Sequence, residues 1–294
     1  MRETPGSISR MRLHSLKPFV VAVIFIGLGA CQSLQDIAGM APKPTAQVVG
    51  SSIRGLSLQN AVLLFDIEIA NPYSAALPLA DLSYTLGSNG RKILEGSIQP
   101  TGSIPARGKQ LIQLPVTVGF APVMAALKGV KPGAVLPYTA DFRISVDAPV
   151  LGRIEVPLSK NGELPIPAVP EVEMSAFEIG KLGLDEVSGT VKLRVRNTNQ
   201  FALDLKKLGM SFALGGQEVG ASRLSDAASL QPGEAATLSV PLSFSPRTAG
   251  ASLLNLLRGK QIAYQVSGSI EANTRFGPIS LPYSKIGNTA VTKP

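Results

Sequence analysis

Apolar and polar residues alternate over short stretches of this chain, and Asn60–Ala70 is the clearest of them. Every second residue from Phe65 to Ile69 is apolar, and the two residues between them are Asp66 and Glu68. Because successive side chains of a β-strand point to opposite faces, this alternation predicts a strand with one face in a core and the other in water.

Turn-forming residues separate further stretches of the same kind. Asn71-Pro72 ends the first strand, since proline disfavours the helical conformation of its predecessor and the Asn side chain can bond its own backbone. The pattern then predicts strands at Leu77–Leu86, Arg91–Ile98, Gln110–Val118, Tyr138–Ala148 and Gly152–Leu158, with a hairpin turn at Gly87–Gly90. One helix is expected at Pro122–Lys128, which has proline near its first turn and Gly129 after its end.

The whole pattern occurs twice. Counting 126 residues on from Asn71 reaches Asn197, and the same step relates Leu77 to Leu203, Leu79 to Leu205, Leu82 to Leu208, Gly90 to Gly216, Pro115 to Pro241 and Tyr138 to Tyr264. The spacing then becomes 125, so that Gly152 corresponds to Gly277 and Pro157 to Pro282. A period of this length indicates two copies of a whole domain, because solenoid repeats are about 20 to 50 residues long.

These elements predict a mainly β chain of two tandem domains. About seven short strands, with turn residues roughly every 8 to 12 positions, are typical of an antiparallel β-sandwich, here with one short α-helix in each copy. We assign the first domain to residues 46–167 and the second to residues 168–290. The three prolines of Leu164–Pro170 predict an extended, semi-rigid linker that spaces the two domains.

The two copies differ in charge and in their helix. On the outward face of the strand, Lys192, Arg194 and Arg196 stand where the first copy has Asp66, Glu68 and Ala70. Either the two faces meet each other or a polar partner, or each is a solvated face whose charge has drifted. The second helix is marked by Leu253, Leu254, Leu256 and Leu257 before Arg258-Gly259, and these leucines either join the core or contact lipid.

Residues 1–30 are expected to be a signal peptide. Arg10, Arg12 and Lys17 precede an apolar run from Pro18 to Ala30, which is shorter than the roughly 20 helical residues that cross a bilayer. Translation from Met11 instead of Met1 would give this leader a more usual basic segment.

The apolar run ends in Leu28, Gly29, Ala30 and Cys31, which resemble the lipobox of bacterial lipoproteins. The resemblance implies cleavage after Ala30 and covalent lipid on Cys31, with residues 31–45 as a tether. The alternative is a membrane anchor with an unrelated cysteine, although Cys31 is the only cysteine of the chain. By the same resemblance, Gln32 after the cysteine favours the outer membrane, with the protein facing the periplasm.

Composition restricts the remaining function classes. The formal charge is +8, to which the leader contributes +3, and the other Lys and Arg residues are scattered singly. A surface that follows a phosphate backbone concentrates its charge, so we expect no nucleic-acid partner. With no cysteine after residue 31 the exported part can form no internal disulfide, and its stability must come from its cores.

The sequence offers little for catalysis. The single histidine, His14, lies in the leader, so the exported part lacks the commonest general base and metal ligand. Ser159-Lys160 and Ser284-Lys285 are neighbours on predicted strands and therefore point to opposite faces. Nothing in the spacing pairs Asp141 with Asp147. We expect no enzyme activity, no metal site and no cofactor beyond the covalent lipid on Cys31.

One set of residues in the first copy forms a motif: Asn71, Pro72, Leu77, Pro78, Leu79, the L-x-Y-x-L of 82–86, Gly90, Pro105, Gly108 and the LPVTV of 114–118. The second copy keeps a weaker version that begins at Asn197. These residues resemble the WHy (water stress and hypersensitive response) domain, also called late embryogenesis abundant (LEA) type 2. The resemblance implies a fibronectin-like or immunoglobulin-like β-sandwich in which they form turns or core. It also implies a link to desiccation, cold and other stresses, with protection of other proteins proposed and lipid binding suggested for some related modules.

Two hypotheses of function follow. The first is a non-enzymatic, lipid-anchored protein of the bacterial envelope that protects against desiccation or cold through contacts with client proteins or the membrane surface. The alternative is a lipid-binding or envelope-assembly module that holds an acyl chain in an apolar cleft. A closed, packed interior favours the first, and an open apolar groove in the hundreds of Å³ favours the second.

Overall fold

The first of two similar halves is built from two antiparallel sheets and one helix. Its elements are β1 (Thr45–Leu56), β2 (Asn60–Ala70), β3 (Leu77–Ser88), β4 (Arg91–Ile98), β5 (Ser103–Ile104), β6 (Lys109–Gly119), α2 (Phe120–Ala126), β7 (Val135–Ala148) and β8 (Gly152–Pro165). One sheet has the order β1-β2-β6 and the other β4-β3-β7-β8, with the short β5 paired to β3. These elements come from a computed structural model, which describes residues 42–289 except 150 and 259.

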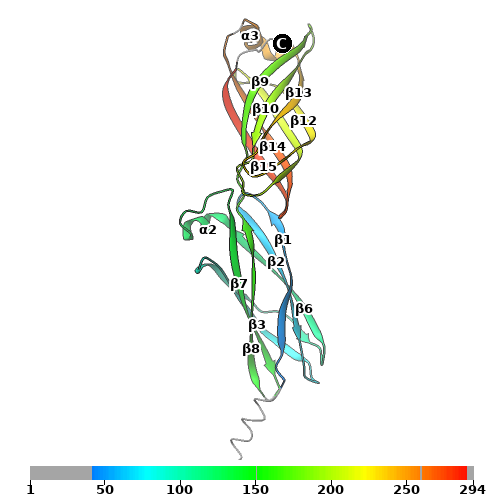
Figure 1. The fold of residues 1–294 in the computed structure, drawn as a ribbon. Helices are drawn as coiled ribbons and strands as arrows, with labels where there is room; N and C mark the ends of the chain where they lie inside the picture. Colours follow the sequence, from blue (N-terminus) through cyan, green and yellow to red (C-terminus); the bar gives the residue numbers. More distant parts are fainter. Residues whose placement is uncertain (1–41, 150, 259, 290–294) are drawn as a thin grey trace, which may run out of the picture.

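The second half repeats this plan, except that one long strand, β12, takes the place of β4 and β5. Its elements are β9 (Glu171–Leu182), β10 (Val187–Arg196), β11 (Leu203–Leu214), β12 (Gln217–Leu230), β13 (Ala235–Phe244), α3 (Pro246–Leu257, kinked at Gly250), β14 (Ile262–Thr274) and β15 (Gly277–Thr289). The sheet orders are β13-β10-β9 and β12-β11-β14-β15. The two sandwiches are stacked end to end, the second above the first in Figure 1. The predicted mainly β fold of two tandem sandwiches, each with a short helix, is confirmed.

The period-two pattern predicted most strands of the first sandwich to within a few residues. β2 and β4 have the predicted bounds, and the turn between β3 and β4 closes at Asn89-Gly90, where both residues have positive φ (51° and 73°). β1 was not predicted as a strand, because two register shifts, at Val48/Gly50 and Ile53/Gly55, break its alternation. α2 begins two residues earlier than predicted, because Phe120 is buried together with Val123, one turn further on.

The change of repeat spacing from 126 to 125 falls in one hairpin turn. Three residues, 149–151, connect β7 to β8, whereas two residues, 275–276, connect β14 to β15. The extra residue is therefore accommodated at the tip of a loop, where it disturbs neither the strand register nor the core.

Each sandwich has its own core, filled by large apolar side chains between its sheets. In the first, the ring of Phe65 lies 5.0 Å from that of Phe142 and 6.3 Å from that of Tyr138, both edge to face. In the second, Phe177 lies 5.4 Å from Phe212. Each of these buried rings contributes roughly 1.5 to 3 kcal/mol through burial alone, so stability is distributed over two separate cores.

A tyrosine packs over a glycine of the neighbouring strand at the same place in both sandwiches. Tyr138 is paired with Gly162, and Tyr264 with Gly287. A Cβ atom built on Gly162 would lie 2.5 Å from Cζ of Tyr138, and one on Gly287 would lie 2.7 Å from Cε1 of Tyr264. Any larger residue would displace the ring, which explains why both residues recur in the repeat.

The predicted linker is partly strand and core. Leu164-Pro165 ends β8, and the side chains of Leu164 and Ile166 are buried in the first core. The expectation that Leu164–Pro170 spaces the two domains was therefore wrong. The prolines indicated a linker, but the two apolar residues between and beside them are buried and hold the chain against the first sandwich.

The two sandwiches meet directly, through backbone and side-chain bonds at one junction. Gln200 donates its backbone N–H to the carbonyl of Gly133 (2.7 Å), and its side-chain oxygen accepts from the N–H of Val135 (3.0 Å). The side chain of Asn199 bonds both backbone groups of Ala168. Arg275 and Glu163 form an ion pair across the junction (2.8 Å). Loops of both sandwiches and the segment between them thus form one bonded unit.

We predict that Gly162→Ala destabilises the first sandwich by about 1 to 3 kcal/mol, since the added methyl group collides with the ring of Tyr138. The measurement is a urea titration of the chain from residue 42 onward, with hydrogen exchange to locate the effect. Ser159→Ala, an exposed substitution on the same strand, is the control and should change stability by less than about 0.5 kcal/mol. Equal stability of the two variants would contradict the packing argument.

Candidate functional site

The predicted lipidation site lies outside the described residues. This applies to Cys31 and to the whole of Leu28–Cys31, as it does to His14. Across residues 42–289, apart from 150 and 259, no helix is both long enough and apolar enough to cross a membrane. The first strand begins at Thr45, whose partner in β2 is Ala70, next to Asn71. The chain thus enters the first sandwich at the end where Asn71 lies, which we call the lower end of a sandwich, as it is in Figure 1.

The motif residue Asn71 is buried at this lower end and is fully hydrogen-bonded. Its side-chain amide donates to three backbone carbonyls, those of Ala75 (2.8 Å), Ile104 (3.2 Å) and Pro105 (2.9 Å), and its carbonyl accepts from the N–H of Tyr73 (2.8 Å). Since Asn71 follows β2 while Ile104 belongs to β5, which pairs with β3, the side chain connects the two sheets. We call this arrangement the asparagine clasp.

The second sandwich has the same clasp at Asn197. The amide of Asn197 donates to the carbonyls of Phe201 (2.8 Å), Leu230 (3.0 Å) and Gln231 (3.3 Å), and its oxygen accepts from the N–H of Asn199 (2.9 Å). Every one of these partners lies 126 residues after its counterpart in the first sandwich. The repeat therefore preserves a hydrogen-bond network as well as a pattern of apolar residues.

The other motif residues surround the clasp. Gly108 accepts from the backbone N–H of Asn71 (2.9 Å), and the carbonyl of Pro105 is one of the clasp acceptors. Leu77 is fully buried, and Pro78 is paired with Ser103 where β3 begins. Pro72 and Leu79 are half-buried beside them. These positions form turns and core, and none of them presents a reactive group.

The charged outer faces of β2 and β10 are paired within their own sandwiches. In the first, Glu68 bonds Lys109 (2.7 Å) and Asp66 bonds Gln113 (2.8 Å). In the second, Lys192 bonds Glu178 (2.5 Å) and Arg196 lies 3.6 Å from Glu171. The faces do not meet each other, and the reversed charge of β10 is matched by acidic residues on β9. These pairs contribute little to stability, because water and salt screen exposed charges.

Hydrogen bonding and burial displace the pKa values of Glu68, Tyr138 and Tyr283. The hydrogen bond from Lys109, with a second from Gln47, lowers the pKa of Glu68. Burial raises the pKa of the hydroxyls of Tyr138 and Tyr283, and Tyr283 donates to the carbonyl of Gly209 (3.0 Å). Burial thus keeps the two phenols protonated and fixed within their sandwiches.

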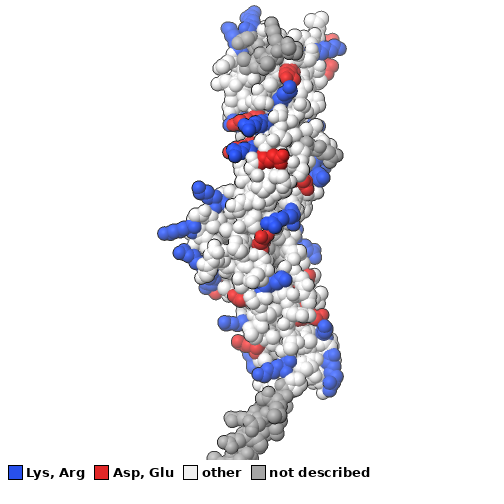
Figure 2. Space-filling view, viewed as in Figure 1, with Lys and Arg blue, Asp and Glu red and all other residues white. Residues whose placement is uncertain are grey.

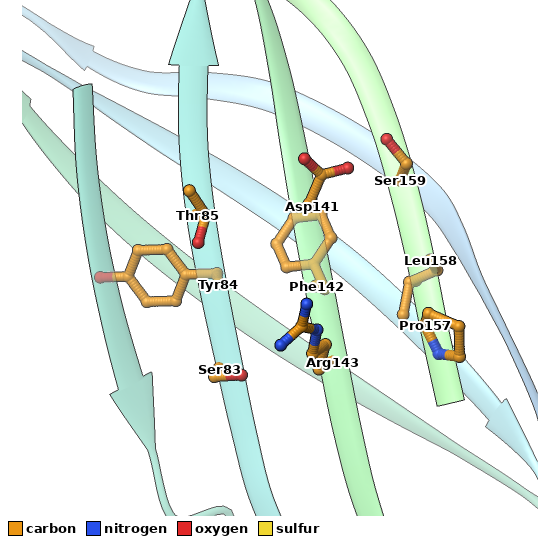
Figure 3. A pocket seen from close by; sticks show the side chains of 9 residues that line it. All are labelled: Ser83, Tyr84, Thr85, Asp141, Phe142, Arg143, Pro157, Leu158 and Ser159. Carbon is orange, nitrogen blue, oxygen red and sulfur yellow. The ribbon is translucent and has the colours of Figure 1, made fainter. Parts of the chain in front are cut away.

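An open cleft of about 630 Å³ lies on the outer face of the β4-β3-β7-β8 sheet. Thr85, Asp141 and Ser159 form one row across three strands of this sheet (Figure 3). Ser83, Arg143 and Pro157 form the next row. Hydroxyl, carboxylate and guanidinium groups so placed can donate and accept hydrogen bonds to another polar surface.

The residue pairs considered for catalysis do not come together in the cleft. Asp141 and Asp147 are six residues apart on β7, about 20 Å along the strand, so they cannot act together. Ser159 is exposed on the cleft while its neighbour Lys160 belongs to the opposite face, as expected. In the described part of the chain, no three acidic, histidine or cysteine side chains lie close enough to hold a metal ion.

Lys and Arg are mixed with Asp and Glu over the whole length of the molecule (Figure 2). Basic side chains gather locally beside α2, where Lys128 and Lys131 are exposed and Arg91 donates to the carbonyl of Ala126 (3.4 Å). This face thus presents many small polar contacts and no continuous basic band.

The leucines of α3 divide between core and surface. Leu253 is buried, whereas Leu254 is 56% exposed and Leu257 is 39% exposed. Of the two alternatives, the core role is confirmed for Leu253 and is wrong for Leu254 and Leu257, while contact with lipid stays a prediction. The helix packs only its inner side on the sandwich and leaves two leucines in water.

Sequence reasoning missed most of the cleft and the junction. Ser83, Thr85 and Arg143 are separated by up to 60 positions, and only the strand register brings them together. Gln200 and Asn199 replace Ser74 and Tyr73 of the first sandwich. This difference was the available sign in the sequence that this end of the second sandwich contacts another surface.

Comparison with known proteins places both sandwiches in one family. The family model described as "Late embryogenesis abundant protein" (LEA_2) matches residues 66–162 and 192–287, together more than half of the chain. The desiccation protectant protein Lea14 homolog of Glycine max is 29% identical over 131 residues, which cover 45% of this chain and 86% of that protein. The desiccation-related protein PCC27-45 of Craterostigma plantagineum is 29% identical over 130 residues, covering 44% and 86%.

Among solved structures, the solution structure of AT1g01470 from Arabidopsis thaliana is similar to part of the chain. It is 28% identical, covers 43% of this chain and 84% of that one, and has a TM-score of 0.36. These relatives correspond in length to about one of the two sandwiches.

We predict that Asn71→Ala destabilises the first sandwich by roughly 2 to 4 kcal/mol, because one buried carbonyl, two partly buried carbonyls and a partly buried N–H lose their partner together. Asn197→Ala should have the same effect on the second sandwich. Hydrogen exchange followed by mass spectrometry would report each loss in its own sandwich. Asn161→Ala removes an exposed asparagine and is the control. If Asn71→Ala left exchange of the first sandwich unchanged, the clasp would not be an important source of its stability.

Proposed function

The chain belongs to the late embryogenesis abundant protein family of type 2, and on that basis we propose that it is a non-enzymatic stress-protection protein of the bacterial envelope. In this proposal covalent lipid on Cys31 tethers it to the outer membrane, facing the periplasm. It protects other proteins, or the membrane surface, during desiccation or cold through contacts of its outer faces.

The observation that carries the proposal is that both sandwiches are filled. Between the sheets of the first, Phe65, Phe120 and Phe142 are at most 1% exposed, and the second holds Phe177 and Phe212 at 0%. Dense aromatic packing leaves the interior to the protein's own side chains. What remains for partners is the outside, which supports a role in surface contact over one in carrying an acyl chain.

The open cleft on the β4-β3-β7-β8 sheet is consistent with such contacts. Its two rows combine the hydroxyls of Ser83, Thr85 and Ser159 with the charges of Asp141 and Arg143. Neither charged side chain has a hydrogen-bond or ion-pair partner among the described residues. Polar groups of this kind can bond the polar surface of a protein or lipid headgroup as water is withdrawn.

The position of Thr45 suits a tether. The chain enters the first sandwich at its lower end, and the second sandwich stands on the upper end of the first. A lipid on Cys31 would therefore leave the long outer faces of both sandwiches clear of the membrane. Residues 31–45 could extend at most about 50 Å, which lets these faces reach neighbouring proteins.

The first test is a freeze–thaw assay with the chain from residue 42 onward, which contains both complete cores. We expect it to preserve more activity of a freeze-sensitive dehydrogenase than an equal mass of serum albumin does. Asp141→Ala combined with Arg143→Ala removes both charges of the cleft and should reduce protection. Glu173→Ala with Arg194→Ala, which removes one acidic and one basic residue from the second sandwich, is the matched control. Protection no better than that of albumin would reject the proposed role.

The second test concerns the anchor. Cells that express the full chain and receive a labelled fatty acid should incorporate label into the protein, and Cys31→Ser should abolish this. The same experiment should move the protein from the outer-membrane fraction to the soluble fraction. Label retained after Cys31→Ser, or none in the parent chain, would contradict lipid anchoring. Lipid recovered by mass spectrometry from the purified chain that starts at residue 42 would instead favour the acyl-binding alternative.

A further inference from the structure

The ends of the two sandwiches differ in what covers them. The upper end of the first sandwich is formed by the β1–β2 turn and α2, and it contacts the lower end of the second sandwich. The equivalent upper end of the second sandwich is formed by the β9–β10 turn and α3, as the pairing of Val187 with Phe244 just before α3 shows. This upper end lies at the far tip of the part of the molecule that the structure describes (Figure 1).

Two leucines of the first sandwich help to seat the second. Leu56 ends β1 and Leu58 lies in the turn that follows, and both are half-buried against the core of the second sandwich. Leu56 also lines a cleft between the sandwiches together with Lys207 and Ile279. These leucines therefore form an apolar contact surface beside the polar junction at Gln200, and we call this surface the seat.

The repeat places the same two leucines on the free end of the second sandwich. Counting 126 residues on from Leu56 and Leu58 reaches Leu182 and Leu184, which end β9 and begin the following turn. Leu182 is 55% exposed and Leu184 is 93% exposed. The second sandwich thus keeps both leucines, and no other element among residues 42–289, apart from 150 and 259, buries them.

Further apolar side chains lie at the same end as these two leucines. Leu254 and Leu257 of α3 are exposed at the same end, where the first sandwich has Lys128 and Lys131 at the matching positions. The first sandwich thus has exposed lysines after the end of α2, where the second has exposed leucines within α3. Clusters of exposed large apolar residues on soluble domains usually mark an interaction surface.

We propose that the free upper end of the second sandwich binds the lower end of the first sandwich of a second copy of this chain. Within one chain, the upper end of the first sandwich contacts the lower end of the second sandwich. The first sandwich has a lower end shaped by the same asparagine clasp. No other sandwich covers it in the described residues. Association is therefore head to tail, and it repeats the internal junction between copies.

The junction between copies is weaker than the internal one. The polar contacts of Gln200 and Arg275 have no equivalent, because Ser74 and Pro149 stand at the matching positions of the first sandwich. The internal junction also benefits from the covalent connection, which acts as a local concentration of about millimolar order. A head-to-tail contact does not close on itself, so it yields chains of copies whose length grows with concentration.

Sedimentation velocity of the chain from residue 42 onward, over a concentration series up to about millimolar, tests the proposal. We expect the weight-average mass to rise with concentration. Leu182→Asp with Leu184→Asp blocks the upper end, and Ser74→Arg with Ala75→Arg blocks the lower end. All four residues are exposed, so the fold should persist. Each double variant alone should remain monomeric, and Leu111→Asp, at an exposed leucine elsewhere, should behave like the parent.

The decisive measurement is the mixture of the two blocked variants. Each retains one competent end, so an equimolar mixture should form a 1:1 dimer and nothing larger. A monomeric parent chain throughout the series would overturn the proposal. Association lost in the leucine variant but kept in the Ser74 and Ala75 variant would also overturn it, because the upper ends would then bind each other. Use of a chain without residues 1–41 makes these outcomes independent of lipidation and of the protection assay.

Discussion

A single buried asparagine in each sandwich holds its two sheets in register with each other. A sandwich of two sheets can slide, because apolar packing has no direction. Hydrogen bonds do have direction. The amide of Asn71 can make its bonds only when the corner after β2 and the turn before β6 are in one arrangement. The same holds for Asn197, the corner after β10 and the turn before β13. Once the corner is fixed, the tyrosine–glycine pairs and the aromatic core can form in one way only.

The duplication has let the two copies take different tasks without altering this frame. Charges exchanged between strands remain paired, as Glu68 with Lys109 and Lys192 with Glu178 show. The extra residue of the first copy lies in a hairpin tip. The sandwich ends differ as well, because Gln200, Asn199 and Arg275 make the junction only in the copy that rests on its neighbour. The frame is conserved within the chain, and the ends are specialised.

This division gives the stress-protection proposal a physical basis. Proteins that act by surface contact need a body that stays folded as water is lost, and two disulfide-free sandwiches obtain this from packed cores and fully bonded buried asparagines. Their outer faces can then vary freely, since few of the exposed charges contribute to stability. The hydroxyl and charge rows beside β7 are of this kind, and so are the leucines at the far tip.

The sequence by itself determined the repeat, the strand pattern, the family motif and the scarcity of catalytic groups, because these depend on local periodicity and on residue identity. Asn71 and Asn197 could be singled out, but their bonds could not, since the acceptors at positions 104 and 230 lie 33 residues away. Only the tertiary structure decided that the proline-rich segment is packed against the first core and that Leu56 is half-buried while Leu182 is exposed. These two leucines in matching positions differ in exposure because a neighbouring sandwich covers Leu56 and not Leu182. Burial by a neighbouring domain cannot be recognised from the local sequence.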